Sequence, residues 1–353
     1  MTSGIVNRMT PQRVLVTGGS GFIAGHCILQ LLEQGYLVRT TVRSLDREAT
    51  VRSVLTDAGM VNGAALSFVA ADLMSDAGWA EAVAGCDFVL HVASPVHLQN
   101  VRNEDDVIAP ARNGTLRVLR AARDAGVRRV VLTSAFHAVG YGHPRSGHTF
   151  TEDDWTVLQG PGVDAYGRSK TLAERAAWDF VTTESDAPEL ATILPVAVMG
   201  PVMGREISGA NHIVQRSLDR EMPGYPDLYI PIVDVRDVAA AHLLAMTTPG
   251  AAGQRFLVSS GAPIPLRQIG AILRDNLGDA ASNVPTRSIP DVFVRAAAIF
   301  VQEFRAFVPD LGFAKKISND KARRVLGLRP RTSEEAVLAT ATSLIAKGLV
   351  KRP

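Results

Sequence analysis

A strand, a glycine-rich turn and a helix follow one another near the N-terminus, in the segment VLVTGGSGFIAG at residues 14–25. The apolar residues 14–16 predict a buried strand. Apolar spacing after Gly21 predicts a helix that runs to about residue 34 and stops at Gly35. This order of elements is typical of a dinucleotide site and constrains the fold more than any other part of the chain.

Each small residue of this segment has a physical role in such a site. Gly18 permits the tight turn, Gly21 has no side chain to keep a pyrophosphate off the backbone, and Ala24 lets the helix pack close to the strand. Phe22 and Ile23 begin the helix, whose free N–H groups and positive dipole end suit phosphate. These positions are therefore predicted to bind a cofactor.

Strand-like and helical segments alternate over the first 200 residues. The strands are predicted at residues 36–42, 66–70, 88–92, 129–133 and 190–198, and the helices at 46–58, near Trp79, at 103–125 and at 164–183. Near-continuous apolar strands are typical of a parallel sheet covered on both faces. We therefore predict an α/β fold with a Rossmann-type, doubly wound parallel sheet, whose ligand lies beyond the carboxyl ends of the strands.

The chain is predicted to divide into three parts. Residues 1–11 form a tail, residues 12–201 the cofactor-binding domain, and residues 202–353 mainly a smaller C-terminal lobe for the substrate, with some segments returning to the first domain. Phenylalanines at near-helical spacing in residues 292–308 predict a helix with a core-facing stripe.

Composition excludes several classes of protein. The chain has 353 residues, 46% of them hydrophobic, and a net charge of +2, which argues against nucleic-acid binding. No apolar run is long enough to span a membrane, and the histidines lack metal-ligand spacing, so we predict no metal. Cys27 and Cys86 lie in apolar patterns and predict reduced core residues of a cytoplasmic protein.

The end of the second predicted strand bears on the choice of cofactor. An acidic residue there usually binds the ribose 2′-hydroxyl of NAD, but this chain has Arg43. A guanidinium matches a 2′-phosphate in shape and charge, so we predict NADPH. The alternative is that Arg43 is a surface arginine and Asp46 binds the ribose. Asp72, with Leu73 beside it, is placed to contact the adenine edge or to cap a helix.

Tyr166 and Lys170 are four residues apart at the start of a predicted helix, in AYGRSKTLAE. This spacing places them on one helix face. An ammonium near a phenol lowers the pKa of the phenol, so the pair is suited to deliver a proton to a carbonyl oxygen while hydride reaches the carbon.

Several motifs together resemble the extended short-chain dehydrogenase/reductase family. They are TGGSGFIAG, AADL after the third strand, HVASP, YGRSK and ILPVAVMGP. RTTVRS, SKTLAERAAW and the tail around residues 322–330 are similar to the branch of dihydroflavonol reductase, cinnamoyl-CoA reductase and microbial NADPH-dependent aldehyde/ketone reductases. The resemblance extends from about Gln12 to Val350.

This resemblance implies a carbonyl reductase with Tyr166 as proton donor and Lys170 as the group that binds the nicotinamide ribose and tunes Tyr166. It implies a small-molecule carbonyl substrate and a monomer or homodimer. Two other functions stay open: a redox-sensing regulator that binds the dinucleotide without turnover, and a nucleotide-sugar epimerase or dehydratase. The resemblance also implies cofactor contacts from Ser94, Pro195 and Val198, and Val92 and Ala93, which precede Ser94, are predicted to contact the cofactor as well.

One position departs from the family pattern. The fifth strand usually ends in Thr-Ser-Ser, whereas this chain has Thr133, Ser134 and Ala135, so an alanine occupies the catalytic-serine position. Loss of such a donor costs about 3 kcal/mol of transition-state stabilisation. Three explanations are considered: His137 or a water substitutes, Ser134 takes the role, or a bulkier substrate tolerates the loss. The substrate pocket is expected to include Ser94, Ala135, Phe136 and Tyr166.

Overall fold

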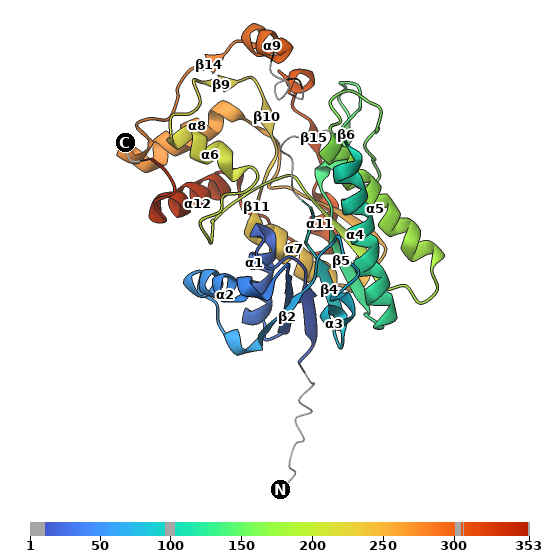
Figure 1. The fold of residues 1–353 in the computed structure, drawn as a ribbon. Coiled ribbons are helices and arrows are strands. Elements are labelled where there is room, and N and C mark those ends of the chain that lie inside the picture. The colour runs from blue at the N-terminus through green and yellow to red at the C-terminus, as the bar shows by residue number, and fades with distance from the viewer. Residues whose placement is uncertain (1–10, 96–102, 301–304, 306, 352–353) are drawn as a thin grey trace.

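The computed structural model describes residues 11–95, 103–300, 305 and 307–351. Within these residues a parallel sheet of seven strands forms the centre of the molecule, in the order β12-β7-β5-β4-β1-β2-β3 (Figure 1). Its strands are β1 (Arg13–Val16), β2 (Leu37–Val42), β3 (Leu66–Ala70), β4 (Phe88–His91), β5 (Arg129–Thr133), β7 (Glu189–Pro195) and β12 (Gln254–Val258). The predicted doubly wound α/β fold is confirmed.

Helices cover both faces of this sheet because the strands are apolar on both sides. One face packs on α1 (Phe22–Glu33), α2 (Glu48–Asp57), α7 (Val235–Thr247) and α11 (Asp320–Val325). The other packs on α3 (Trp79–Val83), α4 (Asp105–Asp124) and α5 (Ala165–Thr183). Crossover connections place the carboxyl ends of all seven strands at one edge, where the loops that follow them meet.

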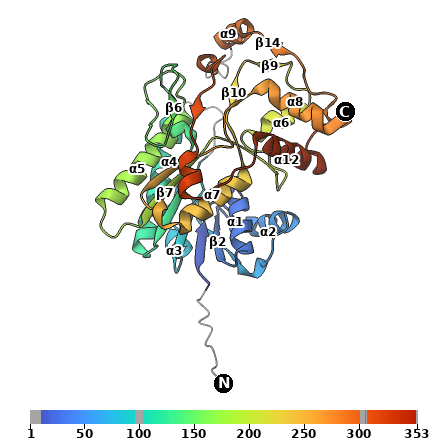
Figure 2. The same ribbon diagram turned by 180° about the vertical axis from the view of Figure 1, so that it is seen from behind.

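The chain after residue 195 builds a second lobe around its own hydrophobic core. Figures 1 and 2 show this lobe standing above the part of the sheet that carries α1 and α2. Its helices are α6 (Asn211–Leu218), α8 (Leu266–Leu277) and α12 (Ser333–Ala346). Its short strand pairs are β8 (Ala197–Met199) with β11 (Ile232–Asp234), β9 (Tyr225–Pro226) with β14 (Ser288–Ile289), and β10 (Tyr229–Ile230) with β13 (Ile264–Pro265).

The single strand predicted at residues 190–198 is wrong. It divides at Val196 into β7, which stays in the central sheet, and β8, which pairs with β11. The chain changes partner there because β12 ends at Val258, and the N–H of Ala197 instead donates to the carbonyl of Pro231. After β11, α7 and β12 return to the first domain.

The core-facing stripe predicted in residues 292–308 is also wrong where the structure describes it. Helix α9 (Asp291–Phe300) buries Val294 and Ala298 but leaves Phe293 65% and Phe300 86% exposed. The helix lies at the periphery of the second lobe (Figure 2), so neighbouring elements cover only part of its apolar side chains. Phe304 lies outside the described residues.

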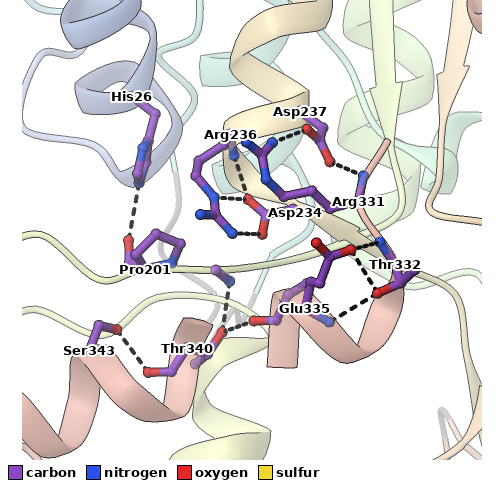
Figure 3. A network of polar contacts seen from close by, with 12 residues as sticks. His26, Pro201, Asp234, Arg236, Asp237, Arg331, Thr332, Glu335, Thr340 and Ser343 are labelled. Atoms are coloured by element: carbon purple, nitrogen blue, oxygen red, sulfur yellow. Dashed lines mark hydrogen bonds and ion pairs between the residues drawn. The ribbon is translucent and has the colours of Figure 1, made fainter. Parts of the chain in front are cut away.

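A polar network joins the two lobes behind the sheet edge (Figure 3). Asp234 caps α7 by accepting from the N–H of Arg236, and Asp237 accepts from Arg331. Thr332 and Glu335 form a capping box at the start of α12. Thr340 accepts the N–H of Gly200 at 2.7 Å, and His26 on α1 contacts the Pro201 carbonyl at 3.1 Å. The loop after β8 is therefore held against both α12 and α1.

Among the described helices, none combines the length and the hydrophobicity needed to cross a lipid bilayer. Cys27 and Cys86 are buried thiols. A further strand pair, β6 (Thr149–Phe150) with β15 (Lys316–Ile317), connects the long loop after β5 to the C-terminal part of the chain.

Candidate active site

The turn between β1 and α1 has the geometry of a phosphate-binding loop. Gly18 has a φ of +74°, and a Cβ there would lie 3.0 Å from the Cβ of Ala93. Gly21 precedes the first turn of α1, and no side chain caps that helix end. The N-terminal N–H groups at Phe22 and Ile23 are thus left for an external anion. This part of the chain fits the pyrophosphate of a dinucleotide.

The end of β4 is tied to this loop. Thr17 accepts the N–H of Ala93 at 2.9 Å and its hydroxyl contacts Nδ1 of His91 at 2.9 Å. Val92, Ala93 and Ser94 therefore lie beside the phosphate loop, as a cofactor-lining segment would. Thr17 and His91 begin the motifs TGGSGFIAG and HVASP, but the sequence did not indicate their contact, because it joins residues 74 positions apart.

Two arginines of the second strand region have different surroundings. Arg43 is exposed just past β2. Arg39 points to the C-terminus of α3 and donates to the carbonyls of Glu81 at 2.8 Å and Ala84 at 2.7 Å. Arg43 is therefore accessible to a ligand, whereas Arg39 has a structural role. The helix-capping alternative for Asp72 is wrong: its carboxylate accepts the N–H of Met74 at 2.9 Å in the turn before α3, and no side chain caps that helix.

Tyr166 and Lys170 lie in the first turns of α5, on one face as their spacing predicts. Asp164 starts this helix by accepting the N–H of Gly167 at 2.7 Å. The Lys170 Nζ lies 5.9 Å from the centroid of the Tyr166 ring and donates to the carbonyl of Thr133 at 3.3 Å. The pair thus meets the end of β5 at the same sheet edge as the phosphate loop.

Burial controls the protonation of this pair. It raises the pKa of Tyr166 to about 12, and the carboxylate of Asp164 adds to that rise. It lowers the pKa of Lys170 to about 8, against the attraction of Glu174. The predicted lowering of the Tyr166 pKa by Lys170 is therefore not the dominant effect in the protein alone. A phenol that keeps its proton at neutral pH can still act as a proton donor.

The residues around the missing serine point in different directions. Ala135 is buried in extended backbone with φ −160°, just before the short turn η3 (Phe136–Ala138). The Ser134 hydroxyl donates to the buried carboxylate of Glu174 at 2.6 Å. His137 instead meets Tyr166, with ring centroids 4.9 Å apart and an edge-to-face arrangement. His137 is therefore the polar side chain of this segment that contacts the phenol.

Aromatic rings extend from His137 to a cavity. His137 stacks on Tyr141 at 4.5 Å, and burial lowers the pKa of His137 to about 4, so its ring is neutral at pH 7. Phe136 is 3% exposed and packs edge-on against Tyr141 and Phe150 in the core. On the far side of Tyr141 lies a cavity of about 340 Å³, whose charged lining residues are Arg145, Arg295, Asp310 and Lys315.

The remaining predicted residues lie along the same edge. Ser94 and Lys170 line one small hollow with Thr133, Ser134 and Glu174. Pro195 ends β7 and pairs with Val258, and Val198 in β8 pairs with Val233. Leu73 packs against Gly114 of α4, where a Cβ would lie 2.8 Å from the Cβ of Leu73. Among the described residues, no group of three or more His, Cys, Asp and Glu side chains could hold a metal ion.

A doubly wound sheet with a phosphate loop and a Tyr–Lys pair at its carboxyl edge defines the class of dinucleotide-binding proteins. Within that class, residues 14–259 match the NAD dependent epimerase/dehydratase family, and the chain belongs to it. The resemblance to extended short-chain dehydrogenases/reductases is thereby confirmed.

Similar proteins are reductases. The ketoreductase azaE of Aspergillus niger is 32% identical over 95% of this chain and 98% of its own length. Cinnamoyl-CoA reductase 1 of Arabidopsis thaliana is 34% identical over 70% of each chain. The yeast methylglyoxal/isovaleraldehyde reductase Gre2, solved with NADPH, has a TM-score of 0.80 and 27% identity, covering 96% of this chain and all of that one.

Proposed function

We propose that this protein is an NADPH-dependent reductase that converts aldehydes or ketones to alcohols. One observation carries the proposal: Tyr166 and Lys170 are held at the sheet edge that also carries the phosphate loop, with Lys170 on the carbonyl of Thr133. The similarity to azaE and to Gre2 solved with NADPH supports both the reaction class and the cofactor.

The protein's own groups account for the proton in this reaction. Bound NADPH supplies the hydride. Tyr166 holds a proton at neutral pH and gives it to the carbonyl oxygen of the substrate. Lys170 supplies positive charge beside the phenol, which favours the phenolate that the transfer leaves behind. Gly18 and Gly21 leave room for the pyrophosphate, and Arg43 is the residue proposed for the 2′-phosphate.

Ala135 cannot donate the hydrogen bond that the usual serine gives to the substrate oxygen, so another group has to supply it. Ser134 is a poor substitute because its hydroxyl is bound to Glu174 at 2.6 Å. His137 is the better candidate, since its ring lies against that of Tyr166 and is neutral at pH 7. We therefore assign His137 as the side chain that contacts the substrate oxygen together with Tyr166.

The cavity beyond Tyr141 bears on the substrate. It has room for more than a short-chain aldehyde, and the excess of cations among its charged residues favours a polar or anionic distal group. Lys315, which lines the cavity, lies over the Tyr141 ring with Nζ 4.6 Å from the centroid, and His137 stacks on the same ring. The Tyr141 ring therefore connects the cavity to His137.

The test is to follow NADPH absorbance with a panel of aryl ketones and aldehydes, in matched pairs with and without a distal carboxylate. Turnover that disappears in Tyr166→Phe, with NADPH binding retained, is the expected result. Tight NADPH binding without turnover on any member would support the regulator instead. Retained NAD with turnover of a nucleotide sugar would support an epimerase or dehydratase, an alternative that Arg43 disfavours.

We further propose that the protein acts in the cytoplasm as a monomer or homodimer. Two buried thiols are consistent with a reducing compartment. Light scattering coupled to gel filtration measures the oligomeric state directly, and a mass above that of a dimer would contradict this assignment.

A further inference from the structure

A buried carboxylate lies one helical turn beyond Lys170. The Glu174 side chain is 0% exposed, and it accepts hydrogen bonds from four residues. These are Ser134 Oγ at 2.6 Å, Thr192 Oγ1 at 2.9 Å, Trp178 Nε1 at 3.3 Å, and Arg255 Nε and Nη2 at 2.7 and 3.3 Å. A buried charge is tolerated only when it is paired and fully hydrogen-bonded, and Glu174 is both.

Arg255 anchors this carboxylate from the edge strand of the sheet. Its other guanidinium nitrogen donates to the carbonyls of Glu152 and Asp154, and the guanidinium stacks 3.7 Å from the centroid of the Trp155 ring. The guanidinium is therefore held on several sides at once. Glu174 is fixed in place by contacts from β7, from β12 and from Ser134, which directly follows β5, as well as from its own helix.

The contact with Ser134 connects Glu174 to the catalytic pair. Ser134 lies between Thr133, whose carbonyl accepts from Lys170, and Ala135, which starts the turn that carries His137. The N–H of Ser134 also donates to the Ile193 carbonyl at 2.8 Å. Without the hydroxyl contact, the segment that includes the Thr133 carbonyl would lose one of the hydrogen bonds that fix it. Lys170 donates to that carbonyl.

Charge provides a second connection. Lys170, Ser134 and Glu174 line the same small hollow. The titratable groups that act on or adjoin Lys170 are Tyr166 and Glu174 on α5, His91 on β4 and His137 on η3. Burial lowers the pKa of both histidines, so both are neutral at pH 7. Glu174 is thus the anion of this group that opposes the desolvation of Lys170.

We propose that Glu174 is the positioning residue of this active site: it fixes the end of β5 through Ser134 and supplies the negative charge that faces Lys170. The inference rests on the proposed reductase function for its kinetic consequence and on the structure alone for its effect on Lys170. Glu174 acts through Lys170 and Ser134, not on the substrate.

The first experiment needs no turnover. The protein is labelled with ¹³C-lysine, and the Lys170 signal, assigned by Lys170→Arg, is titrated in the cofactor-free protein. We expect a titration midpoint of about 8 in the wild type and a midpoint about one unit lower in Glu174→Gln. Glu174→Asp keeps the charge and Ser134→Ala keeps the carboxylate, so both are expected to leave the midpoint near its wild-type value.

The second experiment measures the pH profile of carbonyl reduction. The alkaline limb of kcat/KM should move down by the same unit in Glu174→Gln, which is about a five-fold loss at pH 8. Ser134→Ala should lower kcat without moving the limb. Absence of turnover in the wild type would refute the proposed function, while the lysine titration would still decide the role of Glu174.

One variant guards against loss of the fold. Glu174→Gln leaves Arg255 without its carboxylate, so Glu174→Gln/Arg255→Met removes both buried charges. The attraction on Lys170 comes from Glu174, and the double variant should therefore also lower the lysine midpoint. A folded single or double variant with an unchanged midpoint, even with a reduced Tm, would overturn the proposal and leave Glu174 a structural residue.

Discussion

Arg43 offers a direct test of cofactor recognition because Arg39, four residues earlier on β2, provides a matched control. In Arg43→Ala the 2′-phosphate of NADPH would lose a charge-assisted contact. Such a contact contributes about 2 kcal/mol, which corresponds to about 30-fold in kcat/KM. NADH has no 2′-phosphate, so its kcat/KM should stay unchanged. Because Arg43 is exposed, the free energy of unfolding should change by less than about 0.5 kcal/mol.

Arg39→Ala removes an equal charge four residues away. Arg39 donates to the carbonyls of Glu81 and Ala84 at the end of α3, so its loss should destabilise the fold by about 1 kcal/mol. The ratio of NADPH to NADH activity should not change. Steady-state kinetics with both cofactors and urea unfolding measure the two effects separately.

Two results would refute this reasoning. One is an unchanged kcat/KM for NADPH in Arg43→Ala. The other is an equal fall with NADH, which would place the effect on a part that both cofactors share. Either result would favour the alternative in which Asp46 binds the ribose. Asp46 accepts a hydrogen bond from the Ser44 hydroxyl at 2.9 Å through one carboxylate oxygen, and a carboxylate can accept further hydrogen bonds.

Further variants test the loop, the serine position and the junction between the lobes. Gly21→Ala places a Cβ 3.1 Å from the carbonyl oxygen of Gly18, in the turn proposed to hold the pyrophosphate, so KM for NADPH should rise about ten-fold; an unchanged KM would mean that the phosphate binds elsewhere. Ala135→Ser should change kcat on accepted ketones, by up to about 100-fold if the new hydroxyl reaches the substrate oxygen, and no change on any of them would mean that Ala135 is not the serine position. Thr340→Val removes the acceptor that lies 2.7 Å from the N–H of Gly200, so the free energy of unfolding should fall by about 1–2 kcal/mol in urea titrations; a variant as stable as the wild type would show that Asn211, also in contact with that N–H, suffices.

Local patterns predicted most of the first domain. The glycine turn, the apolar strands and the four-residue spacing of Tyr166 and Lys170 each depend on residues close in sequence, and the structure has them as expected. Such features are set by backbone sterics and helix periodicity, which neighbouring residues determine.

Predictions failed where a partner lies far along the chain. The 190–198 run reads as one apolar strand, but its division depends on whether β12 or β11 supplies the next hydrogen bond. The exposed phenylalanines of α9 have helical spacing. Whether such a helix face is buried depends on whether another element packs on it, and α9 lies at the edge of its lobe. Sequence spacing carries no information on either point.

The active site divides in the same way. The sequence by itself predicted the cofactor loop, the roles of Tyr166 and Lys170, and an alanine at the position of the usual serine. Only the tertiary structure decided that Ser134 turns to Glu174 while His137 turns to Tyr166. Glu174 follows Lys170 by four residues, so the sequence indicates that both lie on one face of the helix. Its partner Arg255, however, is 81 positions away. The reason is that a buried charge is stable only when it is paired. Tertiary packing, and not the local sequence, determines which residue is its partner.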